Sequence, residues 1–165
     1  MTFCIKNYQQ KGGLSTKIHE EPQGERLYEV KGPMGHGLRL QSKGVHVAFA
    51  AGTGALCFVD LVAFLIQANL GLRMGMSGSV NERPKDDEVE IDITQFQLHL
   101  YVSYPRREEG VALELFEALA AYCKRTKNPS FTLHLRLSQE NVNPQRWDEA
   151  FIRQEIARLG GAKAI

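Results

Sequence analysis

The chain has 165 residues, of which 43% are hydrophobic and 24% are charged, proportions typical of a globular protein of about one domain. Its net charge of +1 argues against broad electrostatic binding to nucleic acid or to an anionic membrane. The three cysteines, Cys4, Cys57 and Cys123, have no C-x-x-C spacing. This argues against a disulfide framework or a zinc ribbon and favours a reducing compartment such as the cytoplasm.

The first part of the sequence predicts two strands separated by a short helix. We expect strands at 2–8 and 26–31, paired with each other. Between them, "GGLSTKI" (12–18) predicts a turn into a helix with Ser15 as its N-cap. A glycine-rich turn, "GPMGHGL" (32–38), follows the second strand.

From residue 44 onward, apolar strands alternate with helical patterns. We expect strands at 45–51, 97–104 and 131–137 and helices at 55–69, 109–124 and 147–159. Residues 71–94 carry glycines, a proline and an acidic run, which is typical of a long loop. "AKAI" (162–165) is typical of the start of another strand. This alternation predicts an α/β fold with a parallel sheet covered by helices.

The apolar stretch "HVAFAAGTGALCFVDL" (46–61) needs an interpretation of its own. A membrane span over 45–66 is disfavoured because His46 and Asp60 lie within it and two glycines interrupt it. We interpret it as a buried strand, a Gly52-Thr53-Gly54 turn and a helix. Such a turn can bind phosphate through the free amides of the helix N-terminus. It matches neither G-x-G-x-x-G nor the Walker loop, so a purely structural turn is the alternative.

Four motifs occur in a fixed order along the chain. They are Ile5-Lys6-Asn7-Tyr8, Gly12-Gly13-Leu14-Ser15, Gly32-Pro33-Met34-Gly35, and Gly52-Thr53-Gly54 with Phe58. In this order they resemble the ferredoxin–NADP reductase superfamily, most closely its NADH-dependent cytochrome reductase branch. The resemblance implies that residues 1–35 are the end of a flavin-binding β-barrel and a linker. It implies that residues 36–165 form a Rossmann-like NAD(P)-binding α/β domain without its last strand.

The resemblance also implies which residues contact FAD. Ser15 and the backbone amides of Leu14 and Gly13 would meet the flavin pyrophosphate, as the start of a helix can. Lys6 and Tyr8 would lie near the flavin and the nicotinamide nucleotide. The alternatives are that Ser15 only caps a helix and that Lys6 and Tyr8 only cover a strand surface.

A second group of residues would contact NAD(P)H. Thr53 and the backbone of Gly52 and Gly54 would hold the nicotinamide end. Arg106 and Glu109 would lie near the adenosine ribose, where arginine accommodates a 2′-phosphate and an acid favours a free 2′-hydroxyl. The choice between NADH and NADPH stays open, and a solvated helix start is the alternative for these two residues.

The implied function is that of an FAD-dependent NAD(P)H oxidoreductase. It would pass hydride to FAD and electrons on to a haem domain or another electron-acceptor protein. The chain departs from the family: it lacks the R-x-Y-S/T and C-G-P-P motifs, and Ala55 and Cys57 replace the usual isoleucine and proline. We therefore expect an interior piece of a reductase that is inactive alone and self-associates through an unpaired sheet edge. The alternative is a catalytically inactive binding or structural module.

Other residues have simpler interpretations. His46, His99 and His134 fall on predicted strands without clustered carboxylates or cysteine spacing, so we interpret them as strand-face residues and not as metal ligands. Trp147, the single tryptophan, lies on an amphipathic helix and predicts packing between helix and sheet.

Overall fold

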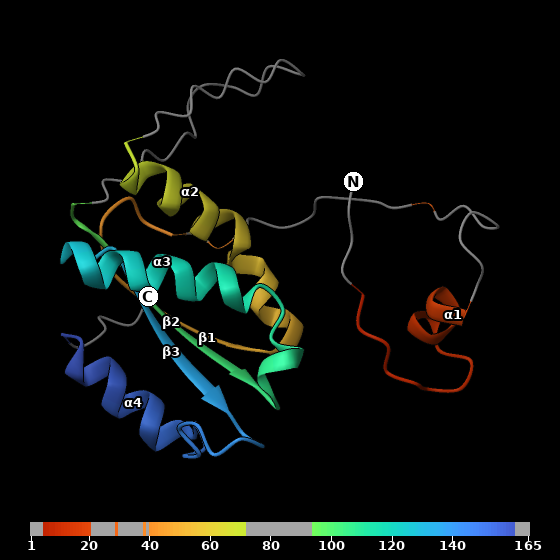
Figure 1. Ribbon diagram of the computed structural model, residues 1–165. Coiled ribbons are helices and arrows are strands. Elements are labelled where there is room, and N and C mark those ends of the chain that lie inside the picture. Colours follow the sequence, from red (N-terminus) through yellow and green to blue (C-terminus); the bar gives the residue numbers. More distant parts are fainter. Residues whose placement is uncertain (1–4, 21–28, 30–37, 39, 72–93, 161–165) are drawn as a thin grey trace. The chain divides into compact units, whose positions relative to one another are not determined.

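The computed structural model describes residues 5–20, 29, 38, 40–71 and 94–160 (Figure 1). The chain divides into two units, residues 1–39 and residues 40–165, each with its own internal contacts. The expected long loop at 71–94, the linker at 32–38 and the strand from 162 fall wholly or mostly outside the described residues.

The second unit contains a three-stranded parallel sheet in the order β1-β2-β3. The strands are β1 (Gly44–Ala51), β2 (Phe96–Tyr104) and β3 (Phe131–Leu137). Ala48 is paired with Leu100, and Leu100 with Leu133. The α/β class and all three strands predicted for this unit are confirmed.

Helices follow each strand, and the first two α-helices of this unit begin four residues later than expected, at residues 59 and 113, each after a 3₁₀ helix. The helices are η1 (Gly52–Phe58), α2 (Val59–Asn69), η3 (Arg107–Glu109), α3 (Leu113–Thr126) and α4 (Glu149–Arg158). The helix expected at 55–69 therefore begins at Gly52 as a 3₁₀ helix and becomes α-helical only at Val59. Two glycines in its first turn disfavour regular α-helix, and 3₁₀ geometry is common at helix N-termini.

One face of the sheet forms the hydrophobic core with α2 and α3. On β2, Leu98, Leu100 and Val102 are fully buried on this face. From the helices, the core receives chiefly Ala55, Val62, Leu65, Phe116 and Leu119. Both helices lie on the same side of the sheet in Figure 1. Period-two alternation on the strands and period-3.6 spacing on the helices explain how the sequence makes this layer.

Helix α4 covers the opposite face of the sheet (Figure 1). Tyr101, whose side chain points away from the α2–α3 core because strand side chains alternate, lies edge-on to Trp147 and Phe151. Asp148 caps the helix, its Oδ1 accepting a hydrogen bond from the Phe151 amide at 2.9 Å. Trp147 packs against the sheet as expected, but it precedes α4, so the expectation that it lies on a helix beginning at residue 147 is wrong.

Within the described residues, one helical stretch, Gly52–Asn69, is long and apolar enough to cross a membrane by length and composition alone. Ala55, Val62 and Leu65 in this stretch are buried in the core. The stretch is therefore weak evidence for a membrane span. On its other side, Phe64 is 39% exposed, and Leu70 just beyond the helix is 55% exposed.

The first unit contains one described helix, α1 (Leu14–Glu20). Residues 5–8 are not in a strand, which corrects the strand expected at 2–8, and the barrel remnant is not shown. The Asn7 side chain accepts a hydrogen bond from the Gln9 amide at 2.8 Å, a local contact that competes with strand pairing. The strand expected at 26–31 lies almost entirely outside the described residues. Ser15 lies inside α1, so it is not the N-cap.

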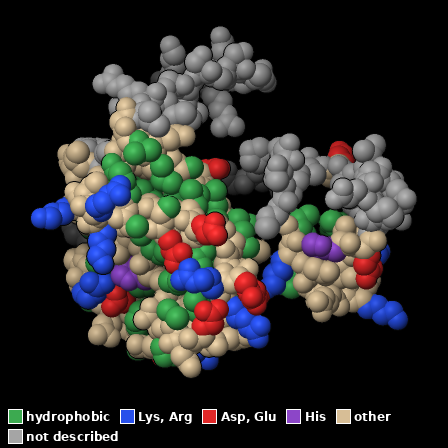
Figure 2. Space-filling view, viewed as in Figure 1, with side chains coloured by type: hydrophobic (Ala, Val, Ile, Leu, Met, Phe, Trp, Pro, Cys, Tyr) green, Lys and Arg blue, Asp and Glu red, His purple; other side chains and the backbone are tan. Residues whose placement is uncertain are grey.

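On the face viewed in Figure 2, acidic and basic side chains of the described residues lie interspersed.

Two adjacent side chains on α2 test where the core lies. Leu65 is fully buried and Phe64 is 39% exposed. Leu65→Ala should lower the free energy of unfolding by about 2–5 kcal/mol, because it leaves a cavity in the core. The control, Phe64→Ala, should cost under about 1 kcal/mol. Urea unfolding followed by circular dichroism measures both, and equal losses would contradict the assignment of the buried face.

Candidate functional site

Two of the predicted nucleotide-binding segments lie at the same carboxyl edge of the sheet. β1 ends at Ala51, which is paired with Ser103 near the end of β2. Gly52–Gly54 and Arg106–Glu109 therefore follow neighbouring strands at the same edge. In open parallel sheets this is the edge at which ligands bind.

The Gly52–Gly54 segment leaves room for a ligand close to its backbone. Gly52 has φ +52°, which favours glycine, and a Cβ at Gly52 or Gly54 would have no atom within 4 Å. Ala51 precedes the helix, and no side chain caps it. Because the first amides of a helix lack intrahelical acceptors, this segment can bind a phosphate group. The residues present therefore fit the phosphate of a nucleotide.

Both arginines after β2 are engaged by neighbouring side chains. Arg106 Nε donates to Gln139 Oε1 at 2.9 Å, and its Nη1 lies 3.5 Å from Glu108 Oε1. Arg107 Nη1 lies 2.8 Å from the Glu117 carboxylate. These groups are exposed, and exposed ion pairs of this kind contribute about 0–1 kcal/mol. A ligand phosphate can therefore compete for Arg106.

A hollow of about 420 Å³ lies beside this loop. It is lined by Arg107, Glu108, Gly110, Ala112, Leu113 and Glu114. Ala112 has φ +61°, a left-handed conformation that is costly for a residue with a Cβ. The hollow is large enough for part of a nucleotide and lies next to Arg106 and Glu109 in the sequence.

The residues expected to contact flavin all lie in the first unit. Tyr8 is 67% exposed, and Lys6 Nζ lies 5.6 Å from the centroid of its ring. The Gly13 amide donates to Gln10 O at 2.8 Å, so it is not free for a pyrophosphate. Leu14 and Ser15 are in the first turn of α1, where amides lack intrahelical acceptors. The described residues thus fit the expected flavin contacts only in part.

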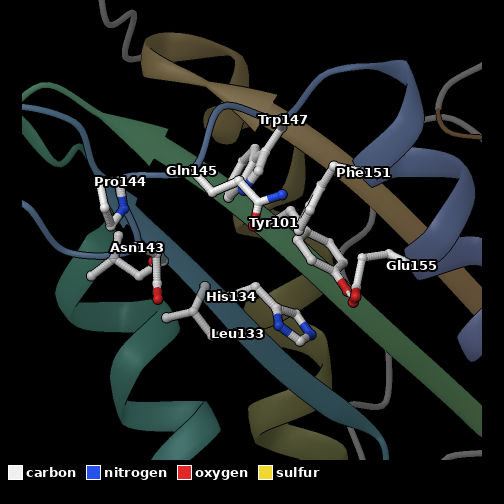
Figure 3. Close-up of a pocket in the computed structure, with 10 residues that line it drawn as sticks. Tyr101, Leu133, His134, Asn143, Pro144, Gln145, Trp147, Phe151 and Glu155 are labelled. Carbon is white, nitrogen blue, oxygen red and sulfur yellow. Dashed lines mark hydrogen bonds between the residues drawn. The ribbon is translucent and has the colours of Figure 1, made fainter.

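The structure also contains an aromatic cluster that the sequence did not predict. Phe49, Tyr101 and His134 are in register across the three strands. Tyr101 stacks on Phe49 with ring centroids 4.5 Å apart and on His134 with centroids 4.0 Å apart. The Tyr101 and His134 rings are nearly parallel, with an interplanar angle of 3°. Trp147 and Phe151 lie edge-on to the Tyr101 ring (Figure 3). The signal in the sequence was three ring side chains on one face of three strands, which becomes visible only once the register is known.

A carboxylate on α4 joins this cluster. Tyr101 Oη donates to Glu155 Oε2 at 2.5 Å, and Arg158 Nη2 lies 2.7 Å from the same oxygen. Burial, and then the hydrogen bond to Glu155, raise the pKa of Tyr101 to about 12. The hydrogen bond from Arg158, and then the one from Tyr101, lower the pKa of Glu155. At neutral pH the tyrosine is therefore protonated and the glutamate ionised.

Two histidines extend the cluster along the sheet. His134 Nε2 lies 3.4 Å from His99 Nδ1. Burial, and then the charge of His99, lower the pKa of His134 to about 4. Burial, and then Arg158, lower the pKa of His99. Both imidazoles are neutral at pH 7 and can share a proton as donor and acceptor.

His46 lies on the other face of the sheet. Its ring stacks on Phe96 with centroids 4.6 Å apart, and burial lowers its pKa. Its Nε2 is buried and has no hydrogen-bond partner among the residues that the structure describes. Among the described residues, no group of three His, Cys, Asp or Glu side chains can hold a metal ion.

Comparisons with protein-family models, with curated proteins and with solved structures found no match for this chain.

The His134 environment predicts how stability depends on pH. Its folded-state pKa is below 6.5, so the unfolded chain takes up the proton first as the pH falls. The native protein should therefore lose stability between pH 6.5 and about 4. His134→Phe keeps a ring but removes this proton. The native protein loses free energy of unfolding between pH 7 and pH 5, and we expect this loss to be smaller in His134→Phe by on the order of 1 kcal/mol, a value reduced because the ring is partly exposed.

Urea unfolding of both proteins at pH 7 and pH 5 measures this difference. His46, on the other face of the sheet, keeps its own pH dependence in both proteins, whereas His99 contacts His134, so the comparison measures the contribution of His134 together with its coupling to His99. Equal losses in the two proteins would show that His134 titrates normally in the folded state.

Proposed function

We propose that residues 40–160 bind NAD(P)H as part of an FAD-dependent oxidoreductase. The parent protein would pass hydride from NAD(P)H to FAD and then electrons to a haem or iron–sulfur acceptor. The observation that carries the proposal is that Gly52–Gly54 and Arg106–Glu109 both lie at the carboxyl edge of the same parallel sheet, after neighbouring strands. Flavin, where bound, supplies an acceptor that converts hydride transfer into single-electron transfer.

Each end of the nucleotide has a proposed position along this edge. The phosphate and nicotinamide end lies at Gly52, Thr53 and Gly54, where the backbone faces open space. The adenosine ribose lies near Arg106 and Glu109, beside the hollow at the end of β2. Arg106 favours a 2′-phosphate, and Glu109, which is exposed, favours a free 2′-hydroxyl.

The position of α4 supports a binding edge at the end of β1. The helices after β1 and β2 cover one face of the sheet, and the helix after β3 covers the other. Connections between parallel strands are right-handed, so the face on which the connecting helix lies decides on which side of the preceding strand the next strand is placed. A connecting helix on the opposite face therefore places the next strand toward the opposite edge of the sheet. A parallel strand that follows α4 would then lie beside β1. Strand order would reverse at β1, which is where nucleotide sites form.

The proposed flavin contacts are Lys6, Tyr8, Leu14 and Ser15. The exposed Lys6–Tyr8 pair and the position of Leu14 and Ser15 in the first turn of α1 support this part. Because the described residues of this unit contain no strand, we expect the isolated chain to hold flavin poorly and to lack reductase activity without an added flavin domain. Flavin absorbance and NAD(P)H-dependent reduction of an acceptor by the purified chain test this directly.

A binding module without catalysis is the second candidate function. The observation that favours it is the Gly13 amide, which donates to Gln10 and is not free for a pyrophosphate. This candidate retains nucleotide binding at Gly52–Gly54 but not hydride transfer. A chain that binds NADH yet stays inactive when a flavin domain is added would favour it.

Gly54→Val tests close approach of the nucleotide. Gly54 has open space beside it and no left-handed φ, so valine should fold normally but obstruct a ligand. We expect at least a tenfold loss of NADH or NADPH affinity by isothermal calorimetry. The control is Cys57→Val, an exposed position one 3₁₀ turn further along the same helix, which should bind as the native chain does. Equal affinity in the native chain and Gly54→Val would mean that the segment is only a turn.

The outer edge of β1 predicts self-association. Gly44 N–H donates to Gln95 O, so alternate residues, including Val47, direct their amides away from β2. Within the described residues, β2 is the only strand that pairs with β1. We expect light scattering to show dimers or larger species. Val47→Pro removes one outward amide and should shift the mass toward the monomer, whereas Val47→Ala should not. A monomeric native chain at high concentration would disprove this.

A further inference from the structure

A second cavity, of about 470 Å³, lies on the face of the sheet covered by α4. It is bounded by β3, the loop at 143–145 and the first turns of α4 (Figure 3). The lining residues that matter for recognition are Tyr101, His134, Gln145, Trp147, Phe151 and Glu155. None of them belongs to the proposed nucleotide site. The volume lies within the range of about 300–1,000 Å³ that is usual for small-molecule sites.

The aromatic walls of this cavity have a defined orientation. His134 stacks on Tyr101 with an interplanar angle of 3°, as the last ring of the row that begins at Phe49. Trp147 and Phe151 are nearly parallel to each other at 10° and lie edge-on to Tyr101. Flat rings set at right angles form a corner, and a planar ligand fills such a corner by stacking on one wall and meeting the other edge-on.

The third wall is a loop held in place by the sheet. Asn143 Nδ2 donates to Leu135 O at 2.6 Å, and Arg136 Nε donates to Gln145 O at 2.9 Å. Arg136 Nη1 also donates to Ser103 Oγ at 3.0 Å. The backbone of the loop is therefore fixed from both ends. A site whose walls are fixed in advance loses less conformational entropy on binding.

Polar groups at the cavity add directional recognition. The side-chain amide of Gln145 makes no hydrogen bond to any described residue, and it offers both a donor and an acceptor. The neutral His134 imidazole has one ring nitrogen near His99 and another that makes no hydrogen bond to any described residue. Glu155 brings a carboxylate, which disfavours a bound anion even though Arg158 is paired with it.

We infer that this cavity binds an uncharged planar heteroaromatic ring of about the size of a nucleobase. Stacking against the aromatic corner supplies the apolar contact, and the Gln145 amide and the His134 nitrogen recognise the polar edge of the ring. The inference does not depend on the proposed function, because the cavity lies on the opposite face from the α2–α3 core and away from Gly52–Gly54.

Trp147 makes binding measurable without a label. It is the single tryptophan of the chain and lines the cavity, so its emission reports this site alone. Adenine is the probe, titrated from micromolar to about 10 mM at pH 7.5 with excitation at the tryptophan band. Cyclohexanol, which is apolar but not planar, and inorganic phosphate are the comparison ligands. We expect a saturable change with adenine and none with the other two.

Variants identify the groups responsible. His134→Ala should weaken adenine binding at least tenfold, and His134→Phe, which keeps the stacked ring, should retain most of the stacking contribution. Gln145→Leu, on the exposed loop, should weaken binding severalfold without affecting the core, so it stands as the test if His134→Ala fails to fold. Cys57→Val, which lies outside both sites, should bind adenine as the native chain does.

Three results would overturn the inference. They are the absence of a saturable adenine response up to about 10 mM, an equal response to cyclohexanol, and unchanged adenine affinity in both His134→Ala and Gln145→Leu. None of these results bears on NAD(P)H binding at Gly52–Gly54, which Gly54→Val tests separately.

Discussion

The burial of β2 on both faces is the constraint on which the second unit depends. Leu98, Leu100 and Val102 require a hydrocarbon layer on one face, and Tyr101 requires cover on the other. A parallel central strand of this kind cannot satisfy its backbone or its side chains without a strand on each edge and helices on both faces. The positions of β1, β3 and the three longer helices follow from this requirement, and so does the carboxyl edge at which the loops meet.

The two faces are stabilised by different interactions. The α2–α3 side is packed with aliphatic side chains and several phenylalanines, where burial is non-directional. The α4 side combines the Phe49–Tyr101–His134 row with the hydrogen bond from Tyr101 to Glu155. Stacked rings and hydrogen bonds need particular angles and distances. A cavity remains between β3, α4 and the loop at 143–145 because their side chains do not fill the space. This cavity is the place at which we infer that a planar ligand binds.

At the carboxyl edge of the sheet, the backbone of one loop is accessible and the charged side chains of the other are paired with neighbouring side chains. Gly52 and Gly54 face empty space, whereas Arg106 and Arg107 are paired with Gln139, Glu108 and Glu117. The pairs orient the loop after β2 without fixing it strongly, because exposed ion pairs contribute little free energy. A nucleotide bound here would exchange weak internal contacts for stronger contacts with phosphate. The proposed function therefore requires little rearrangement of the sheet.

The sequence by itself determined the α/β class, the three strands and the approximate helices, because hydrophobic periodicity is local and the core of this unit obeys it. It also placed Gly52–Gly54 and Arg106–Glu109 after neighbouring strands. It failed over residues 5–8, where Asn7 makes a local hydrogen bond in place of a strand contact, and at Ser15, which lies inside the helix. Only the tertiary structure decided that Phe49, Tyr101 and His134 stack and that Glu155 meets Tyr101. Such contacts depend on strand register and on the face to which α4 returns, and both are set by packing between segments far apart in the chain.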